Sequence, residues 1–272
     1  MKNSALQKQD GYLIGDVSQI VGLSRDALRF YEKKGVITAR KKDNGYRYYS
    51  EEDIYKLMYI FYHRKMNTSL DTLEGLMNGN NSLPSIRDHI NRRMSEETHE
   101  LRLHHQAITR LKLVEKDLER IERCLGSFSV RKFPHAFILN QCSCLQEGLK
   151  TWFHLASSIE GLDMTYFYTL LTYTGRSLSP EGTRLLLYKG LERELGDKFD
   201  PAIYPMTDEF ACIYTVMEAQ DTLPGVEMIR EMIQWGKDQG LETDGRVYAN
   251  NMTSFFDRDD AKYCLELYMP IK

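Results

Sequence analysis

Residues 13–53 constrain the fold of this chain more than any other stretch. Ile14, Val17, Ile20 and Val21 sit at helical spacing, so a short helix can bury one face there. Gly22 ends that helix, because glycine adopts positive φ without a side-chain clash, and Ser24 is a favoured N-cap for a second helix. Two helices joined by so short a turn are typical of a helix-turn-helix, whose second helix lies in a DNA major groove.

The segment after the second helix predicts a small β-hairpin, and a third helix should open at Ser50 with Asp53 in its capping box. Asn44-Gly45 favours a type I′ turn, which needs positive φ at both central residues. From Arg25 to Arg47 there are eight basic residues and three acidic ones, although the whole chain has a net charge of −3. This local excess of positive charge favours a polyanionic partner.

Taken together, these motifs resemble the DNA-binding domain of the MerR family of transcription regulators. The resemblance rests on Ile14-Gly15-Asp16-Val17, on Leu28-Arg29-Phe30-Tyr31-Glu32-Lys33 with Gly35, and on Asn44-Gly45-Tyr46-Arg47-Tyr48-Tyr49. It implies a winged helix-turn-helix over residues 1–82 that binds double-stranded promoter DNA. The candidate DNA-binding residues lie on the second helix and the hairpin: Arg25, Arg29, Tyr31, Lys33, Arg40, Lys41, Arg47 and Tyr48.

Length and composition suit a multidomain protein with no membrane partner. The 272 residues are enough for two domains and a connector, and no run approaches the ~18 apolar residues that cross a bilayer. Residues 1–11 are polar and lack the apolar core of a signal peptide, so we expect a cytoplasmic protein. The five cysteines lack a secreted-type framework, which agrees with a reducing compartment.

Charge is divided unevenly along the chain. Residues 1–80 carry a net charge of +3, residues 81–129 carry +1 and residues 130–272 carry −7. Because DNA is a polyanion, we expect the acidic C-terminal part to make no direct contact with it.

Residues 85–125 have the pattern of one long amphipathic helix. They contain no glycine or proline, and two series recur at seven-residue spacing. The series are Leu101 with Ile108, and His104 with Leu111, Leu118 and Leu125. We expect residues 83–126 to be a dimerisation helix that forms a coiled coil with a second protomer, because the chain has no second helix of that length. The alternative is a helix packed on its own C-terminal domain.

From Val130 onward the pattern changes to an α+β alternation. We expect helices over 149–159 and 225–240, and strands over 137–139, 166–174, 185–188, 211–217, 248–256 and 263–269. This order suggests two related halves. It resembles the gyrase-inhibitor-like (GyrI-like) effector domain of multidrug-sensing MerR regulators, together with the ending Glu266-Leu267-Tyr268-Met269-Pro270-Ile271. The resemblance implies that residues 127–272 form an effector (ligand)-binding domain.

The aromatic content of this part predicts a site for a lipophilic compound. Aromatic faces attract cations by ~0.5–2 kcal/mol each, and a buried carboxylate adds a preference for positive charge. The multidrug-sensing relatives place such an acid after a tyrosine on a late strand, where this chain has Ala249, and Glu266 matches a second acid of the GyrI-like pattern. The candidate ligand-binding residues are Trp152, Tyr168, Tyr214, Tyr248 and Glu266. For each of these aromatic residues, packing in the hydrophobic core is as good an interpretation as contact with a ligand.

Cys142 and Cys144 are the pattern that most suggests a metal. The resemblance to the MerR family implies that its metal-sensing members are short chains with cysteines near the end of the dimer helix. Cys142 and Cys144 instead lie beyond the end of the predicted dimer helix. We therefore expect two ordinary small residues, and no metal or other cofactor. No nucleophile–base pair, phosphate loop or pair of catalytic carboxylates stands out, so we expect no enzyme. The GyrI-like fold does include hydrolase-like members.

The resemblances together imply a homodimeric, ligand-responsive activator. MerR regulators distort a promoter spacer so that RNA polymerase can use both promoter elements, and the effector here would be a lipophilic compound, with cations favoured. Two alternatives stay open. One is a metal- or redox-responsive regulator of the same family, and the other is a ligand-sequestering or hydrolase-like protein with a DNA-binding tail.

Overall fold

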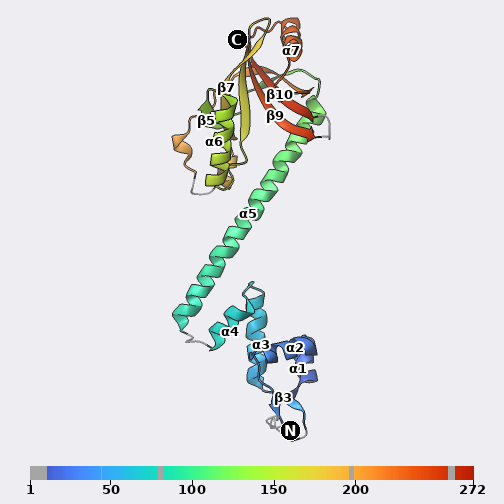
Figure 1. The fold of residues 1–272 in the computed structure, drawn as a ribbon, viewed down its shortest axis with the longest axis vertical. Coiled ribbons are helices and arrows are strands. Elements are labelled where there is room, and N and C mark those ends of the chain that lie inside the picture. The colour runs from blue at the N-terminus through green and yellow to red at the C-terminus, as the bar shows by residue number, and fades with distance from the viewer. Residues whose placement is uncertain (1–10, 44, 79–81, 196–198, 257–260) are drawn as a thin grey trace, which may run out of the picture. The chain divides into compact units, whose positions relative to one another are not determined.

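A computed structural model describes residues 11–43, 45–78, 82–195, 199–256 and 261–272. The chain divides into two compact units, Met1–Glu100 (unit 1) and Leu101–Lys272 (unit 2) (Figure 1). The predicted N-terminal helix-turn-helix, long helix and β-rich C-terminal domain are all present.

Unit 1 is a small helical bundle with a three-stranded sheet. Its helices are α1 (Ile14–Val21), α2 (Arg25–Lys33), α3 (Glu51–Arg64) and α4 (Leu70–Asn78). Its strands are β1 (Tyr12–Leu13), β2 (Arg40–Lys41) and β3 (Arg47–Tyr49), in the sheet order β1-β3-β2. The fully buried Val17 and Leu28 lie at the centre of a core that reaches from Tyr12 to Met77. Ile20, which was predicted on the buried face of the first helix, is 54% exposed, because it lies on the side of α1 away from this core.

The predicted helix boundaries of unit 1 are confirmed. Gly22 has φ 70° after α1, and the Ser24 hydroxyl accepts a 3.1 Å hydrogen bond from the Ala27 amide. Ser50 and Asp53 form the expected capping box at the start of α3. Gly45 has φ 78°, but its amide donates a hydrogen bond to the Lys42 carbonyl and the Lys42 amide donates one to the Tyr46 carbonyl, so three residues connect the strands and not the two of the predicted type I′ turn. Asn44 itself lies outside the described residues.

The long helix α5 (Leu83–Cys124) has 42 residues and a different environment on its two sides. Beyond residue 100, one side packs on unit 2 and buries Gln106 and Cys124. The other side leaves the predicted seam exposed, as Leu111 is 71% exposed and Leu101 is 59% exposed. The alternative, that the helix packs on its own C-terminal domain, therefore holds for one side of its second half, because a helix can pack against a sheet as well as against another helix. Pairing of the exposed side with a second protomer stays a prediction.

Unit 2 contains a seven-stranded antiparallel sheet and two helices. The helices are α6 (Leu145–Ser158) and α7 (Val226–Asp238), with short 3-10 turns η1 (Leu191–Glu194) and η3 (Pro201–Ile203). The strands are β4 (Ser129–Lys132), β5 (Ala136–Cys142), β6 (Tyr166–Tyr173), β7 (Leu178–Tyr188), β8 (Ala211–Ala219), β9 (Arg246–Phe256) and β10 (Ala261–Pro270). The sheet order β4-β8-β10-β9-β6-β7-β5 places two similar halves, β8-β10-β9 and β6-β7-β5, side by side.

The two faces of this sheet have different cover. Helices α6 and α7 pack closely on one face, where a Cβ on Gly148 would meet Phe167 and a Cβ on Gly236 would meet Ile213. The opposite face carries Tyr168, Tyr214 and Tyr268, which cluster with Phe133 and with Cys124 at the end of α5. Strand β4 was not predicted, because a mostly exposed Ser-Val-Arg-Lys run has no buried alternation. No described helix is long and apolar enough to cross a membrane.

Candidate nucleic-acid interface and ligand pocket

Helix α2 presents the predicted basic residues on the surface of unit 1. Arg25, Arg29 and Lys33 are exposed, whereas Tyr31 is half-buried against the core. The Arg29 guanidinium forms a 2.9 Å ion pair with Asp26, and both side chains are largely open to water. Such a pair adds little stability, so Arg29 can exchange this partner for a phosphate.

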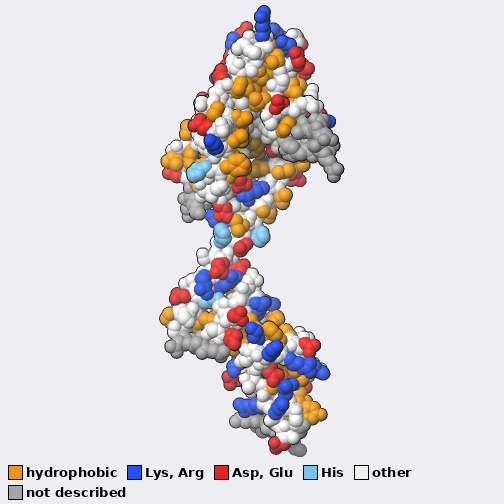
Figure 2. Space-filling view, viewed as in Figure 1, with side chains coloured by type: hydrophobic (Ala, Val, Ile, Leu, Met, Phe, Trp, Pro, Cys, Tyr) orange, Lys and Arg blue, Asp and Glu red, His pale blue; other side chains and the backbone are white. Residues whose placement is uncertain are grey.

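The predicted hairpin forms and brings four candidate residues together. Arg40 pairs with Tyr48 and Lys41 pairs with Arg47 across β2 and β3. The Arg47 guanidinium lies 3.4 Å from the Glu32 carboxylate, and the Lys42 ammonium lies 4.6 Å from the Tyr48 ring centre. In Figure 2 many Lys and Arg side chains gather on the visible face of unit 1.

Glu32 ties the hairpin to α2. Besides its pair with Arg47, its carboxylate accepts a 3.2 Å hydrogen bond from the Tyr49 hydroxyl. Burial, followed by the neighbouring Glu32 charge, raises the pKa of Tyr49 to about 12. Tyr49 therefore stays a neutral donor at physiological pH, and this bond holds the hairpin against the helix that precedes it.

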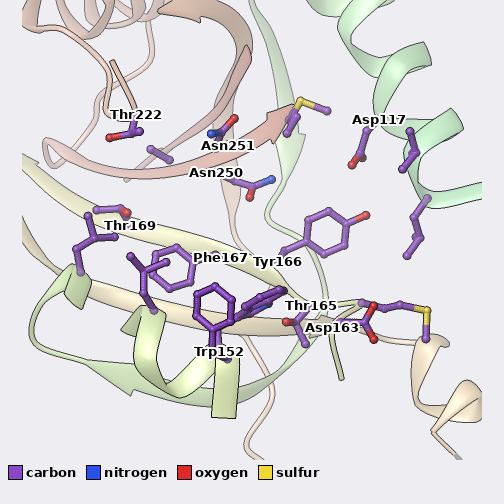
Figure 3. Close-up of a pocket in the computed structure, with 18 of the residues that line it drawn as sticks. Asp117, Trp152, Asp163, Thr165, Tyr166, Phe167, Thr169, Thr222, Asn250 and Asn251 are labelled. Carbon is purple, nitrogen blue, oxygen red and sulfur yellow. The ribbon is translucent and has the colours of Figure 1, made fainter. Parts of the chain in front are cut away.

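Unit 2 contains a pocket of about 540 Å³. Its walls are mainly apolar and come from α5, α6, β6, β9 and the turn before α7. Figure 3 shows Trp152 and Phe167 on the α6 side and Asp117 on the α5 side, with Tyr166 and Asn250 between them. An apolar cavity of this size with a few convergent polar groups is typical of small-molecule sites.

The pocket opens where the two halves of the sheet separate. Described pairing between β6 and β9 runs from Thr172–Arg246 to Tyr168–Asn250 and stops there. Beyond that pair, Tyr166 on β6 and Met252 on β9 line the pocket instead of bonding to each other. Both faces of the sheet therefore contribute side chains to one cavity.

Glu266 lies next to this pocket, fully buried in a cluster of hydrogen-bond donors. Its carboxylate accepts bonds from the hydroxyls of Tyr168 (3.0 Å), Tyr214 (3.1 Å) and Tyr268 (3.1 Å), and from the Asn250 amide (3.3 Å). The fifth donor is the Arg120 guanidinium of α5, at 2.8 Å. A buried carboxylate is costly unless it is paired, and here every side of it is satisfied.

Arg120 also forms an ion pair with Asp117, one turn earlier on α5. Burial disfavours the Arg120 charge, but Glu266 and Asp117 together hold its pKa above the ordinary value. Burial raises the pKa of Asp117, the nearby Glu266 charge adds to that rise, and Arg120 opposes it. One guanidinium thus serves two buried carboxylates.

A second arginine of α5 lies at the pocket wall. Arg110 donates two hydrogen bonds of 2.6 Å to the carboxylate of Asp163, just before β6. The bonds from Arg110 lower the pKa of Asp163 below its ordinary value. This pair is neutral overall, and together with Arg120 it fixes the second half of α5 to unit 2.

The structure divides the predicted ligand-binding residues into two groups. Trp152 lines the pocket. Tyr168, Tyr214, Tyr248 and Glu266 lie together in the buried aromatic cluster, where the Tyr248 ring packs 4.7 Å from Phe133. None of these four is among the pocket-lining residues, because their side chains point into the core behind Asn250.

Sequence reasoning missed Asp117, Arg120 and Asn250. The signal that could have found the first two is a second series on the long helix, Gln106, Arg110, Leu113, Asp117, Arg120 and Cys124, spaced by three and four residues. This series faces unit 2, whereas the sequence prediction for the long helix rested on the more apolar series at seven-residue spacing.

Cys142 and Cys144, the two cysteines of the possible metal pattern, lie in different secondary-structure elements and differ in exposure. Cys142 lies on β5, 3.9 Å from the Thr151 hydroxyl, and Cys144 is the exposed N-cap residue of α6. Within the described ranges, no three His, Cys, Asp or Glu side chains come together as a metal site.

Comparison with known proteins gives matches for the first part of the chain. The family described as MerR HTH family regulatory protein matches residues 12–80. The HTH-type transcriptional regulator ZntR homolog of Haemophilus influenzae is 31% identical over 105 residues, which are 38% of this chain and 78% of that protein. The HTH-type transcriptional regulator CueR of Escherichia coli is 33% identical over 92 residues, 34% of this chain and 68% of that protein.

These relatives are transcription regulators and not enzymes, which confirms the expectation for this chain. Among solved structures, the cryo-EM structure of the EcmrR–DNA complex in EcmrR-RPo covers 96% of this chain and 99% of that chain, at 18% identity and a TM-score of 0.38.

Proposed function

The chain belongs to the MerR family of helix-turn-helix transcription regulators, and from that premise we propose that it is a homodimeric activator controlled by a lipophilic compound. The compound binds unit 2, which we take to be a GyrI-like effector domain. The observation that carries the proposal is the 540 Å³ apolar pocket, one wall of which is the same helix, α5, that runs back into the DNA-binding unit.

DNA recognition is assigned to α2 and the hairpin. The exposed cations of α2 support insertion of that helix into the major groove, since a recognition helix needs side chains free to reach base edges. Arg40, Lys41 and Arg47 on the hairpin suit the phosphate backbone, with Tyr48 beside them. Lys33 and Tyr31 complete the proposed interface at the C-terminal end of α2.

A second copy of the chain is the proposed partner of the exposed face of α5. Leu101, Ile108, Leu111 and Leu118 are all at least 45% exposed and follow one side of the helix. An apolar stripe of that length is costly in water and suits a coiled-coil seam. A two-fold dimer would present two recognition helices to a symmetric operator.

Activation is proposed to follow from distortion of the promoter by the dimer, so that RNA polymerase can use both promoter elements. Smooth bending of a site of this kind costs on the order of 1–6 kcal/mol. Phosphate contacts from two winged units would offset that cost. Binding of the compound next to α5 would favour the distorting state of the dimer, since a ligand shifts an equilibrium only by its differential affinity for the two states.

The test combines operator selection with transcription in vitro. The full-length protein is used to select binding sites from random DNA, and RNA polymerase is then supplied with a promoter that carries the selected site. We expect a two-fold symmetric site, and transcription that rises when tetraphenylphosphonium, a lipophilic cation, is added. The Trp152→Ala variant should keep its DNA affinity and lose this response, because Trp152 lines the pocket and is remote in sequence from unit 1.

A response to zinc, copper or an oxidant, with none to lipophilic compounds, would overturn the proposal in favour of a metal or redox sensor. Turnover of the added compound would instead favour the hydrolase-like alternative.

A further inference from the structure

The carboxylate expected to select a cationic ligand is already occupied. Glu266 accepts hydrogen bonds from three tyrosines and Asn250, and it is paired with Arg120 at 2.8 Å. A carboxylate offers about four lone-pair positions, so Glu266 has no acceptor capacity left for a ligand. A cation could reach it only by displacing an arginine of the same chain.

Among the described residues, the charged side chains around the pocket nevertheless leave an excess of one negative charge. Asp117 and Glu266 share the single guanidinium of Arg120, whereas Arg110 and Asp163 neutralise each other. Arg131, another cation beside this cluster, is exposed and packs over the Tyr214 ring at 4.2 Å. In an environment of low dielectric, one uncompensated charge strongly favours a counter-ion.

Asp117 is the member of this cluster that faces the pocket. Its side chain is 13% exposed, and it lines the cavity together with Tyr166 and Asn250. Figure 3 shows Asp117 on α5 directed toward the space that Tyr166 and Trp152 border. Aromatic rings around a carboxylate provide both the apolar surface and the negative π-faces that a lipophilic cation needs.

A second polar group of the pocket also lacks a partner. The Thr165 hydroxyl oxygen is buried and has no hydrogen-bond partner among the described residues, and Thr165 lines the same cavity. A buried hydroxyl of this kind is usually satisfied by water or by a ligand group. This observation is independent of the charges and supports a small-molecule occupant.

We infer that Asp117, on the long helix, is the charge-selecting residue of the pocket, which binds a lipophilic monocation whose charge lies between Asp117 and the rings of Tyr166 and Trp152. The inference rests on the proposed function, because it names the ligand class and the selecting residue of the same pocket. Glu266 then has a positioning role: it holds Arg120, and Arg120 holds Asp117 at the wall. The cation is bound directly by α5, so the helix that carries the dimer seam also carries the ligand charge.

The experiment measures binding of three probes of similar size to the full-length protein by calorimetry. Tetraphenylphosphonium is cationic, triphenylphosphine oxide is neutral and tetraphenylborate is anionic. The unmodified protein should prefer the cation to the anion. Asp117→Asn keeps the shape and removes the charge, so the cation should bind about tenfold more weakly, as expected for loss of one ion contact, while the neutral probe should be affected less than about twofold.

Glu119→Gln is the matched control. Glu119 lies on the same helix two residues away, is exposed and pairs with Arg123, so all three probes should bind this variant as they bind the unmodified protein. Circular dichroism melting of each variant checks that a loss of binding is not a loss of fold. As a second variant, Asp117→Glu keeps the charge and should retain the preference for the cation over the anion.

Equal weakening of cation and neutral probe by Asp117→Asn would overturn the inference and leave the proposed effector pocket intact. The same holds if Asp117→Asn has no effect and Glu266→Gln abolishes the cation preference. If the unmodified protein binds none of the three probes, the proposed function fails together with the inference.

Discussion

Unit 1 and unit 2 use charged residues in opposite ways. In unit 1 the arginines and lysines of α2 and the hairpin lie outside, and their ion pairs with Asp26 and Glu32 remain open to water. In unit 2 the decisive charges lie inside, where Glu266 is fully buried and Arg120 bridges it to Asp117. Water screens the first set and leaves it free to exchange partners, whereas the protein fixes the second set in one arrangement.

The difference teaches where each kind of recognition can occur. A polyanion such as DNA approaches from outside and needs many weak, replaceable contacts, so exposed cations suit it. A small lipophilic ion has to be desolvated before it binds, and a buried charge excess in an aromatic pocket offsets that cost. In the proposed function, the exposed cations of unit 1 bind DNA in a salt-dependent way, whereas the charge in the pocket of unit 2 selects the ligand.

The largest expected effect concerns the exposed apolar stripe of α5. Without dimerisation through this stripe, the exposed cations of two copies of unit 1 cannot bind one two-fold operator together. Replacing Leu111 and Leu118 together by Asp would place charges in the proposed seam, at a cost of several kcal/mol. We expect a monomer in sedimentation and loss of operator binding. Replacing Lys112 and Glu119 by Asp, one position further along the helix, is the control and should leave a dimer. A dimeric Leu111→Asp, Leu118→Asp protein would refute the seam.

The next prediction concerns how much the buried charges of unit 2, Glu266 and Arg120, contribute to its stability. Glu266→Ala leaves Arg120 with Asp117 alone and removes the acceptor of the buried Tyr214 and Tyr268 hydroxyls, whereas the Tyr168 hydroxyl keeps its 2.6 Å bond to Tyr188. We expect the free energy of unfolding of unit 2 to fall by about 3–5 kcal/mol. Both tryptophans, Trp152 and Trp235, lie in unit 2, so their fluorescence during urea unfolding reports this unit alone.

The control for that measurement is Glu209→Ala, which removes the exposed pair between Lys132 and Glu209. Its urea midpoint should match that of the unmodified protein. Equal midpoints for Glu266→Ala and Glu209→Ala would mean that inward and outward charges do not differ in their contribution to stability, and the contrast between the units would fail.

The smallest effects concern the outward charges of unit 1. Arg47→Ala should weaken binding to all DNA sequences and lower the slope of log affinity against log salt by roughly one per lost phosphate contact. Arg25→Ala should instead change base preference, by ~1–3 kcal/mol if the side chain reaches a guanine edge. Titration of DNA at several salt concentrations separates the two. An Arg47→Ala protein with unchanged affinity at both low and high salt would contradict the hairpin assignment.

Local signals made most of unit 1 predictable. Gly22, Ser24 and the Ser50–Asp53 box each act within four residues of their own position, so the sequence alone identifies the helix ends. The strands of unit 2 were predictable for a similar reason, because runs such as 166–173 have strong β propensity. Strand β4 was missed, because it is a mostly exposed edge strand whose side chains show no pattern of burial.

The candidate site was predictable only in part, because its interactions are long-range. Glu266 and its tyrosines were singled out from residue type, but its cation, Arg120, lies 146 residues earlier in the chain. Nothing local to either residue indicates that pairing. The pocket depends on where β6 and β9 part, at Tyr168 and Asn250, which are 82 residues apart in the chain. The pairing register of two such strands cannot be predicted from the sequence of either one.

The place of β10 in the sheet has a consequence for the order in which the molecule is made. It follows β8 and β9 in the sequence and so leaves the ribosome after them, yet it lies between them in the interior of the sheet and contributes Glu266. The core of unit 1 is complete by Met77, so that unit can fold while the rest is still being translated. Until β10 arrives, strands β8 and β9 lack the neighbour that joins them, and Arg120 lacks its buried counter-ion Glu266. With the proposed function, the nascent chain would acquire the ability to recognise DNA before it acquires the ability to sense a ligand.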